Sequence, residues 1–243
     1  MDKKQDIDLF NMVEEYRKEL LEFYSPYFSG DKELRDFVNI AFNYDEEYSQ
    51  IRFMIQQVQR FVALANDIDK IRPARDPLRI FFLKTCLESL CNISGYKNKK
   101  QFFYDFEECF SEDGKDYILS NIVFKGIDLP EKWSPLEMAK YGDYLNKDFS
   151  IRNLLNIIKV VRDMVVHDGN YWSMQFFVCD NSTWITEIIT DEDILEMGKN
   201  YKKEKLTYCF NTKLNYKEFI FYFVQACVNF IAKKREATKL YSK

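Results

Sequence analysis

Apolar residues recur every three or four positions over long stretches of this chain, and this spacing limits its fold more than any other feature. The clearest stretch is 150–167, whose apolar seam consists of Ile151, Leu154, Ile158, Val161 and Val165. Such spacing places apolar side chains on one face of an α-helix. Gly169 follows this stretch, and glycine is the usual residue at a left-handed helix end. The pattern therefore predicts an amphipathic helix that covers a core.

Further helices are predicted from the same spacing along most of the chain. They cover 8–24, 31–42, 46–71 and 216–237, and one more runs from residue 76 toward Gly95. Shorter helices are expected over 97–146. Only 7 glycines and 5 prolines interrupt the 243 residues, whereas 22 phenylalanines and 16 tyrosines supply large apolar surfaces. Few turn-forming residues favour long helices over a many-stranded sandwich. The sequence therefore predicts an all-α fold.

The segment after residue 170 has a different pattern, which is typical of strands. The β-prone runs 172–178 and 183–188 flank the turn-forming segment 180–182, and this arrangement predicts a β-hairpin. A third β-prone run, 206–210, is able to pair with it. We therefore expect a helical bundle with a small β-hairpin-like appendage after residue 170.

The expected domain organisation follows from these patterns. An N-terminal helical extension covers 1–44, a helical bundle covers 45–170, and the β-prone segment with the last helix covers 171–243. A single domain over 1–243 is the alternative, because a chain of this length can enclose one large core.

Charge and cysteine content exclude several classes of function. A formal net charge of −4 argues against coating of nucleic acid by bulk electrostatics, although it permits a local grip on a few phosphates. The six cysteines form no Cys-x-x-Cys pair, and a single histidine leaves no partner for a mixed zinc site. We therefore expect no metal and no cofactor.

The chain shows neither a signal peptide nor a long uncharged apolar run, which predicts a cytoplasmic protein without a membrane partner.

The only histidine, His167, lies five residues after Arg162 at the end of the predicted helix over 150–167. Cleavage of RNA by its own 2′-hydroxyl needs a proton shuttle that works near neutral pH, and histidine supplies one. It also needs a fixed cation where charge builds on the phosphate, which suits the planar fork of arginine. Positions five apart on a helix do not face the same way. A second helix or a second copy would have to bring the two groups to one phosphate.

The segment Arg162-Asp163-Met164-Val165-Val166-His167 resembles the Arg-polar-x3-His motif of the HEPN superfamily. The resemblance implies a HEPN-like helical bundle that forms a homodimer with a composite active site. It also implies a metal-independent endoribonuclease for single-stranded RNA, of a toxin, phage-defence or RNA-processing type. Arg162, Asp163 and His167 would then be the catalytic residues, with Glu88 as a supporting acidic residue on an earlier helix. An antitoxin or other regulatory protein is a further partner that the resemblance allows.

Another interpretation of the motif stays open at this stage. A catalytically inactive HEPN-like dimer that binds RNA, a nucleotide or a protein partner would keep the same motif for its fold. The candidates for RNA binding are three arginines near the helix-breaking prolines Pro73 and Pro77. They are Arg72, Arg75 and Arg79. The more common role of such a charged cluster is a solvated helix end.

Overall fold

The computed structural model describes residues 3–128, 150–169, 171, 174–176, 184–190, 194–197, 200–203 and 206–241. The helices are α1 (Lys3–Tyr24), α2 (Asp31–Ile40), α3 (Ser49–Ile71), α4 (Asp76–Ile93), α5 (Lys99–Glu107), α6 (Glu112–Asn121), α8 (Ile151–Asp168) and α9 (Tyr216–Tyr241). Two 3-10 turns, η1 (Ser25–Tyr27) and η2 (Glu46–Tyr48), join the first three helices. The predicted all-α fold class is confirmed.

The ends of α8 follow the local signals in its sequence. Ser150 and Asn153 form a reciprocal capping box, in which each side chain accepts a hydrogen bond from the backbone N–H of the other. This arrangement satisfies two backbone donors that a helix start otherwise leaves free. At the other end Gly169 adopts a left-handed conformation with φ of 60° and donates its N–H to Met164, as the sequence predicts.

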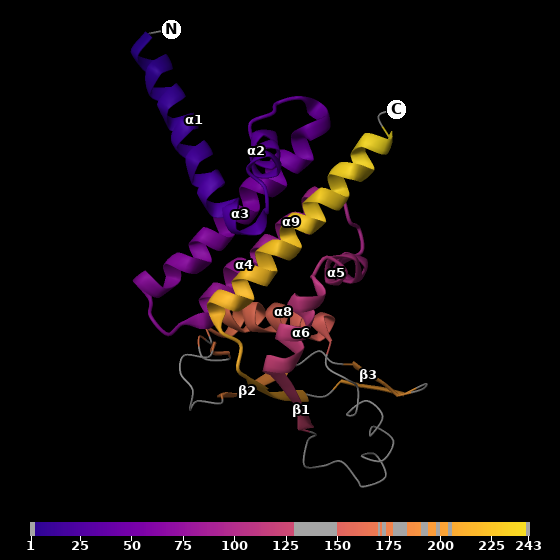
Figure 1. The fold of residues 1–243 in the computed structure, drawn as a ribbon. Coiled ribbons are helices and arrows are strands. Elements are labelled where there is room, and N and C mark those ends of the chain that lie inside the picture. The colour runs from indigo at the N-terminus through magenta and orange to yellow at the C-terminus, as the bar shows by residue number, and fades with distance from the viewer. Residues whose placement is uncertain are drawn as a thin grey trace.

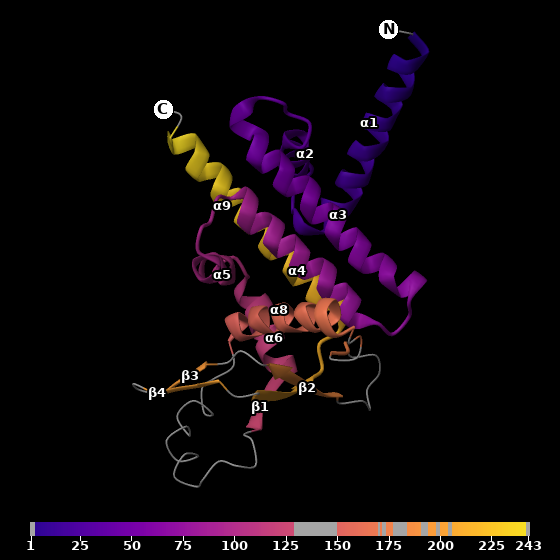
Figure 2. The same ribbon diagram turned by 180° about the vertical axis from the view of Figure 1, so that it is seen from behind.

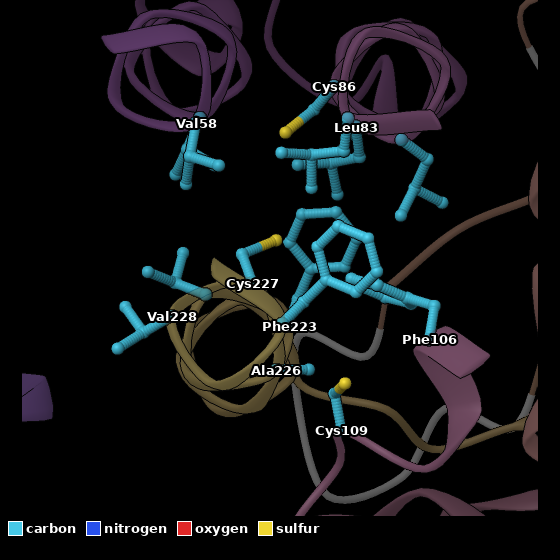
Figure 3. Close-up of a cluster of buried hydrophobic side chains, with 14 of the residues drawn as sticks. Val58, Leu83, Cys86, Phe106, Cys109, Phe223, Ala226, Cys227 and Val228 are labelled. Atoms are coloured by element: carbon cyan, nitrogen blue, oxygen red, sulfur yellow. The ribbon is translucent and has the colours of Figure 1, made fainter. Parts of the chain in front are cut away.

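The long helices α3, α4 and α9 pack side by side, and α8 lies across one end of them (Figures 1 and 2). Figure 3 shows side chains from four helices pointing toward one another in the core, including Val58 of α3, Leu83 of α4, Phe106 of α5 and Phe223 of α9. The same buried cluster extends to Leu20 of α1. Large aromatic and aliphatic side chains fill this core, which fixes α4 and α8 against each other.

A small sheet lies beyond α8 on the side away from the long helices (Figure 1). Its strands are β1 (Ile122–Asp128), β5 (Leu206–Thr212) and β2 (Trp184–Thr190), all antiparallel, with β5 in the centre. The register pairs Thr212 with Ile122 on one side and with Trp184 on the other. A separate antiparallel pair consists of β3 (Ile194–Met197) and β4 (Asn200–Lys203).

The predicted strand over 183–188 and its pairing with 206–210 are confirmed by β2 and β5. The prediction of a partner strand over 172–178 is wrong for the residues that the structure describes there, because Met174–Phe176 form no strand. Phe176 instead donates its N–H to the carboxylate of Asp76 at 2.7 Å and stacks its ring on Phe219. The predicted turn at 180–182 lies outside the described residues. One strand, β1, comes from the region before α8, where the sequence predicts only short helices.

Candidate functional site

Four charged side chains meet where α8 crosses α4. Arg162 of α8 bonds through Nη2 to Oε1 of Glu88 on α4, and through Nη1 to Asp163 Oδ1 at 2.8 Å. Lys84, one turn before Glu88 on α4, places its Nζ 3.0 Å from the same Oε1. The structure therefore joins three of the predicted site residues, Arg162, Asp163 and Glu88, and adds a lysine to them.

Arg162 is held firmly by these contacts. Its side chain is only 21% exposed, and its Nε is buried without a hydrogen-bond partner among the described residues. Two carboxylates on one guanidinium restrict its rotation, because an arginine fork bonds carboxylates with defined geometry. The arginine of the motif therefore has a fixed position at the edge of the helical core.

The charges of this cluster depend on one another. Burial acts to raise the pKa of the Glu88 carboxyl, but the bound Lys84 and Arg162 outweigh it and hold that pKa below its usual value. Burial lowers the pKa of the Lys84 ammonium, and its bond to Glu88 offsets part of that effect. The ion pair thus favours the charged forms of a buried lysine and a half-buried glutamate.

Lys99, at the start of α5, extends the cluster toward solvent. Its Nζ lies 4.0 Å from Glu88 Oε1, and its side chain is 71% exposed. A shallow hollow of about 10 Å³, room for about one water molecule, lies beside Glu88, with Lys84, Lys99, Phe102 and Phe103 among its lining residues. The α4–α5–α8 junction therefore carries three cations around one half-buried carboxylate.

His167 stands apart from this cluster. It lies in the last turn of α8 and is exposed, as are its neighbours Val166 and Asp168. Within the described part of the chain it forms no hydrogen bond or ion pair, whereas Arg162 turns toward α4. The structure thus keeps the two motif residues on different sides of α8, as the five-residue spacing predicts.

The three arginines near the start of α4 differ in their surroundings. Arg79 is covered, because it pairs with Asp76 at 2.9 Å and Asp69 at 3.2 Å and lies over the ring of Tyr216. Arg72 ends α3 and is exposed, and Arg75 directly precedes α4 and is half-buried. Arg79 therefore ties helices together, while Arg72 and Arg75 lie nearer the surface.

Lys84 is the site residue that sequence reasoning missed. It stands among core-facing residues of α4, between Ile80 and Leu87, and its side chain is 3% exposed. A lysine on an apolar helix face, four residues before a glutamate, is a readable signal, because residues four apart on a helix are neighbours. Burial of a lysine is rare unless it is paired, so this spacing would have indicated a buried ion pair.

Among the described residues, no three His, Cys, Asp or Glu side chains converge as ligands for a metal ion. The same residues include no helix that is long and apolar enough to cross a membrane. Comparison with family models, with curated proteins and with solved structures finds no match to this chain.

Proposed function

We propose that this protein is a metal-independent, HEPN-like endoribonuclease that cleaves single-stranded RNA by attack of a 2′-hydroxyl on the neighbouring phosphate. In this proposal His167 transfers the proton as general acid or base, and Arg162 holds the scissile phosphate. Asp163 orients Arg162, and Glu88 braces it from α4. The product would carry a 2′,3′-cyclic phosphate, and no metal takes part in the reaction.

The observation that supports this proposal most is the state of Arg162. Its guanidinium is fixed by Glu88 and Asp163 at the junction of α4 and α8, five residues before an exposed histidine. A half-buried arginine that served the fold alone would not require an exposed imidazole at the end of the same helix. A fixed cation and an accessible imidazole are the two groups that metal-free cleavage requires.

The geometry favours a site shared between two copies of the chain. Arg162 faces α4 while His167 faces solvent, so a single chain does not present both groups to one phosphate. In a symmetric dimer the same surface of each copy meets its equivalent. If the ends of the two α8 helices meet in this way, His167 of each copy lies beside Arg162 of the other copy. We propose a homodimer with such a composite site, of a toxin, phage-defence or RNA-processing type, which an antitoxin or regulatory protein could silence.

Arg72 and Arg75 are proposed as contacts to the RNA backbone. The chain after α8 returns to the start of α4, since Phe176 bonds to Asp76, so these arginines lie on the helix end that this returning segment reaches. The double variant Arg72→Ala/Arg75→Ala should reduce the slope of log affinity against log salt by about 1 to 2 for single-stranded RNA. Fluorescence anisotropy over a salt series measures this slope. An unchanged slope would remove the two arginines from the interface.

The proposed function is tested by incubating the protein with end-labelled single-stranded RNA in excess EDTA. Cleavage should proceed at the rate seen without chelator, because the proposed chemistry uses only side chains. The fragments should end in 2′,3′-cyclic phosphate, which resists a phosphatase until acid opens the ring. Cleavage that EDTA abolishes would contradict the mechanism. A folded dimer that binds RNA or another partner and cuts no RNA would indicate the inactive HEPN-like module.

A further inference from the structure

Lys84 is the least expected charge in the described core. Its side chain is 3% exposed, and its ammonium reaches one partner, Oε1 of Glu88, at 3.0 Å. The ring of Phe103 lies near the ammonium, with its centroid 5.6 Å away. Transfer of a lysine charge from water into such surroundings costs stability, and an apolar side chain of similar shape often serves a fold as well or better. Packing alone therefore gives no reason for a lysine here.

The sum of the charges around Arg162 indicates an electrostatic role for Lys84. Arg162 faces the carboxylates of Glu88 and Asp163, so these three groups together carry one negative charge. That charge would repel an RNA phosphate. The ammonium of Lys84 brings the cluster to neutrality, and Lys99, 4.0 Å from Glu88, makes it positive. Only with these lysines does the site become suited to an anion.

Lys84 and Arg162 also compete for the same atom. Both bond to Oε1 of Glu88, and a carboxylate oxygen that is shared between two cations holds each of them less strongly than it would hold one. Arg162 thereby stays aligned by Glu88 without being fully neutralised by it. Because its side chain is only 3% exposed, Lys84 acts on the site through its bond to Glu88 and through its charge rather than by binding RNA.

We infer that Lys84 is a positioning residue of the Arg162 site: its ammonium shares Oε1 of Glu88 with the guanidinium and offsets the charge of that carboxylate, so that the guanidinium remains available to an RNA phosphate. This inference rests on the proposed function. It is supported by the low pKa of the Glu88 carboxyl, which its bonds to Lys84 and Arg162 maintain against the effect of burial. The charged groups that face Lys84 are Glu88 on its own helix, Arg162 on α8 and Lys99 on α5.

The first test needs no RNA. In Lys84→Met the apolar stem remains and the charge is lost, so burial should raise the pKa of Glu88 with only Arg162 and Lys99 to oppose it. The carbon NMR signal of the Glu88 carboxyl, assigned with Glu88→Gln, should titrate at a pH at least about one unit higher than in the wild type. An unchanged midpoint would overturn the inference.

The second test separates positioning from packing. The double variant Lys84→Met/Glu88→Gln removes the buried ammonium together with its half-buried partner, so its melting temperature should equal or exceed that of the wild type. Its kcat/KM for single-stranded RNA should nevertheless fall about 10- to 100-fold, because Arg162 loses its brace. A role in packing alone predicts that activity follows stability. Full activity in the double variant, or in Lys84→Met, would overturn the inference.

Lys115→Met provides the matched control. Lys115 is a largely covered lysine that pairs with Glu112 on α6, and its charged neighbours are Glu112, Glu108 and Glu107, so its loss should leave cleavage unchanged. A wild type that cuts no RNA would refute the proposed function. The carboxyl titration would then still decide whether Lys84 sets the charge of Glu88, so the two failures are distinguishable.

Discussion

His167→Ala is expected to lower kcat for cleavage of single-stranded RNA by about 10²- to 10⁴-fold, which is the usual contribution of a positioned acid or base. The chain contains one histidine, so no other imidazole can replace it as a proton shuttle near neutral pH. The side chain is exposed at the end of α8, and exposed substitutions rarely change stability by more than about 0.5 kcal/mol. Initial rates in EDTA, beside melting curves of both proteins, measure the effect.

The control for this substitution is the next residue in the chain. Asp168 is exposed in the same helical turn, and Asp168→Asn changes a charge at the same helix end without touching the imidazole. Its kcat should stay within about threefold of the wild type, since a surface charge near a site alters mainly encounter and salt dependence. If His167→Ala cleaved as fast as Asp168→Asn, His167 would have no part in the chemistry, and the inactive module would be the better interpretation.

The sequence predicted best those features that depend on neighbouring residues. The boundaries of α8 follow from its apolar seam and from Gly169, and both signals act within a few positions of the helix end. Arg162 and Asp163 are adjacent, and their ion pair at 2.8 Å needs no tertiary contact. The prediction of Glu88 came from the resemblance, and its bond to Arg162 depends on how α4 packs on α8.

Features that depend on distant contacts could not be predicted in the same way. β1 forms because 122–128 pairs with β5, which lies after α8 in the chain, and no local pattern reveals that partner. Phe176 looked like part of a strand, but its N–H and ring are taken up by the start of α4 and by α9. The spacing of Lys84 and Glu88 indicates their pairing on α4, but the third partner, Arg162, comes from α8, and only the packing of α8 on α4 brings it to the same carboxylate.

Arg162→Ala and His167→Ala are each expected to be inactive, but a dimer that contains one chain of each variant is expected to regain activity. Arg162→Ala supplies an intact His167, and His167→Ala supplies an intact Arg162, so a mixed dimer has one complete pair if the two residues act across the interface. With random exchange about half of the dimers are mixed, and each has one of two sites complete. The mixture should therefore regain about a quarter of wild-type kcat. Co-expression with two affinity tags, followed by purification on both, isolates the mixed dimer for measurement.

A site shared between two copies of the chain requires this recovery. Within one chain Arg162 turns to Glu88 and His167 to solvent, so a site inside a single copy would require α8 to present two of its sides to one phosphate. A mixed dimer that stays inactive would mean that the pair acts within one chain or that all four residues are needed at once. The matched control joins Arg162→Ala with the double variant Arg162→Ala/His167→Ala; it contains no Arg162 and should show no recovery. Recovery in the test mixture alone would thus assign the phosphate-holding cation and the proton shuttle to different subunits.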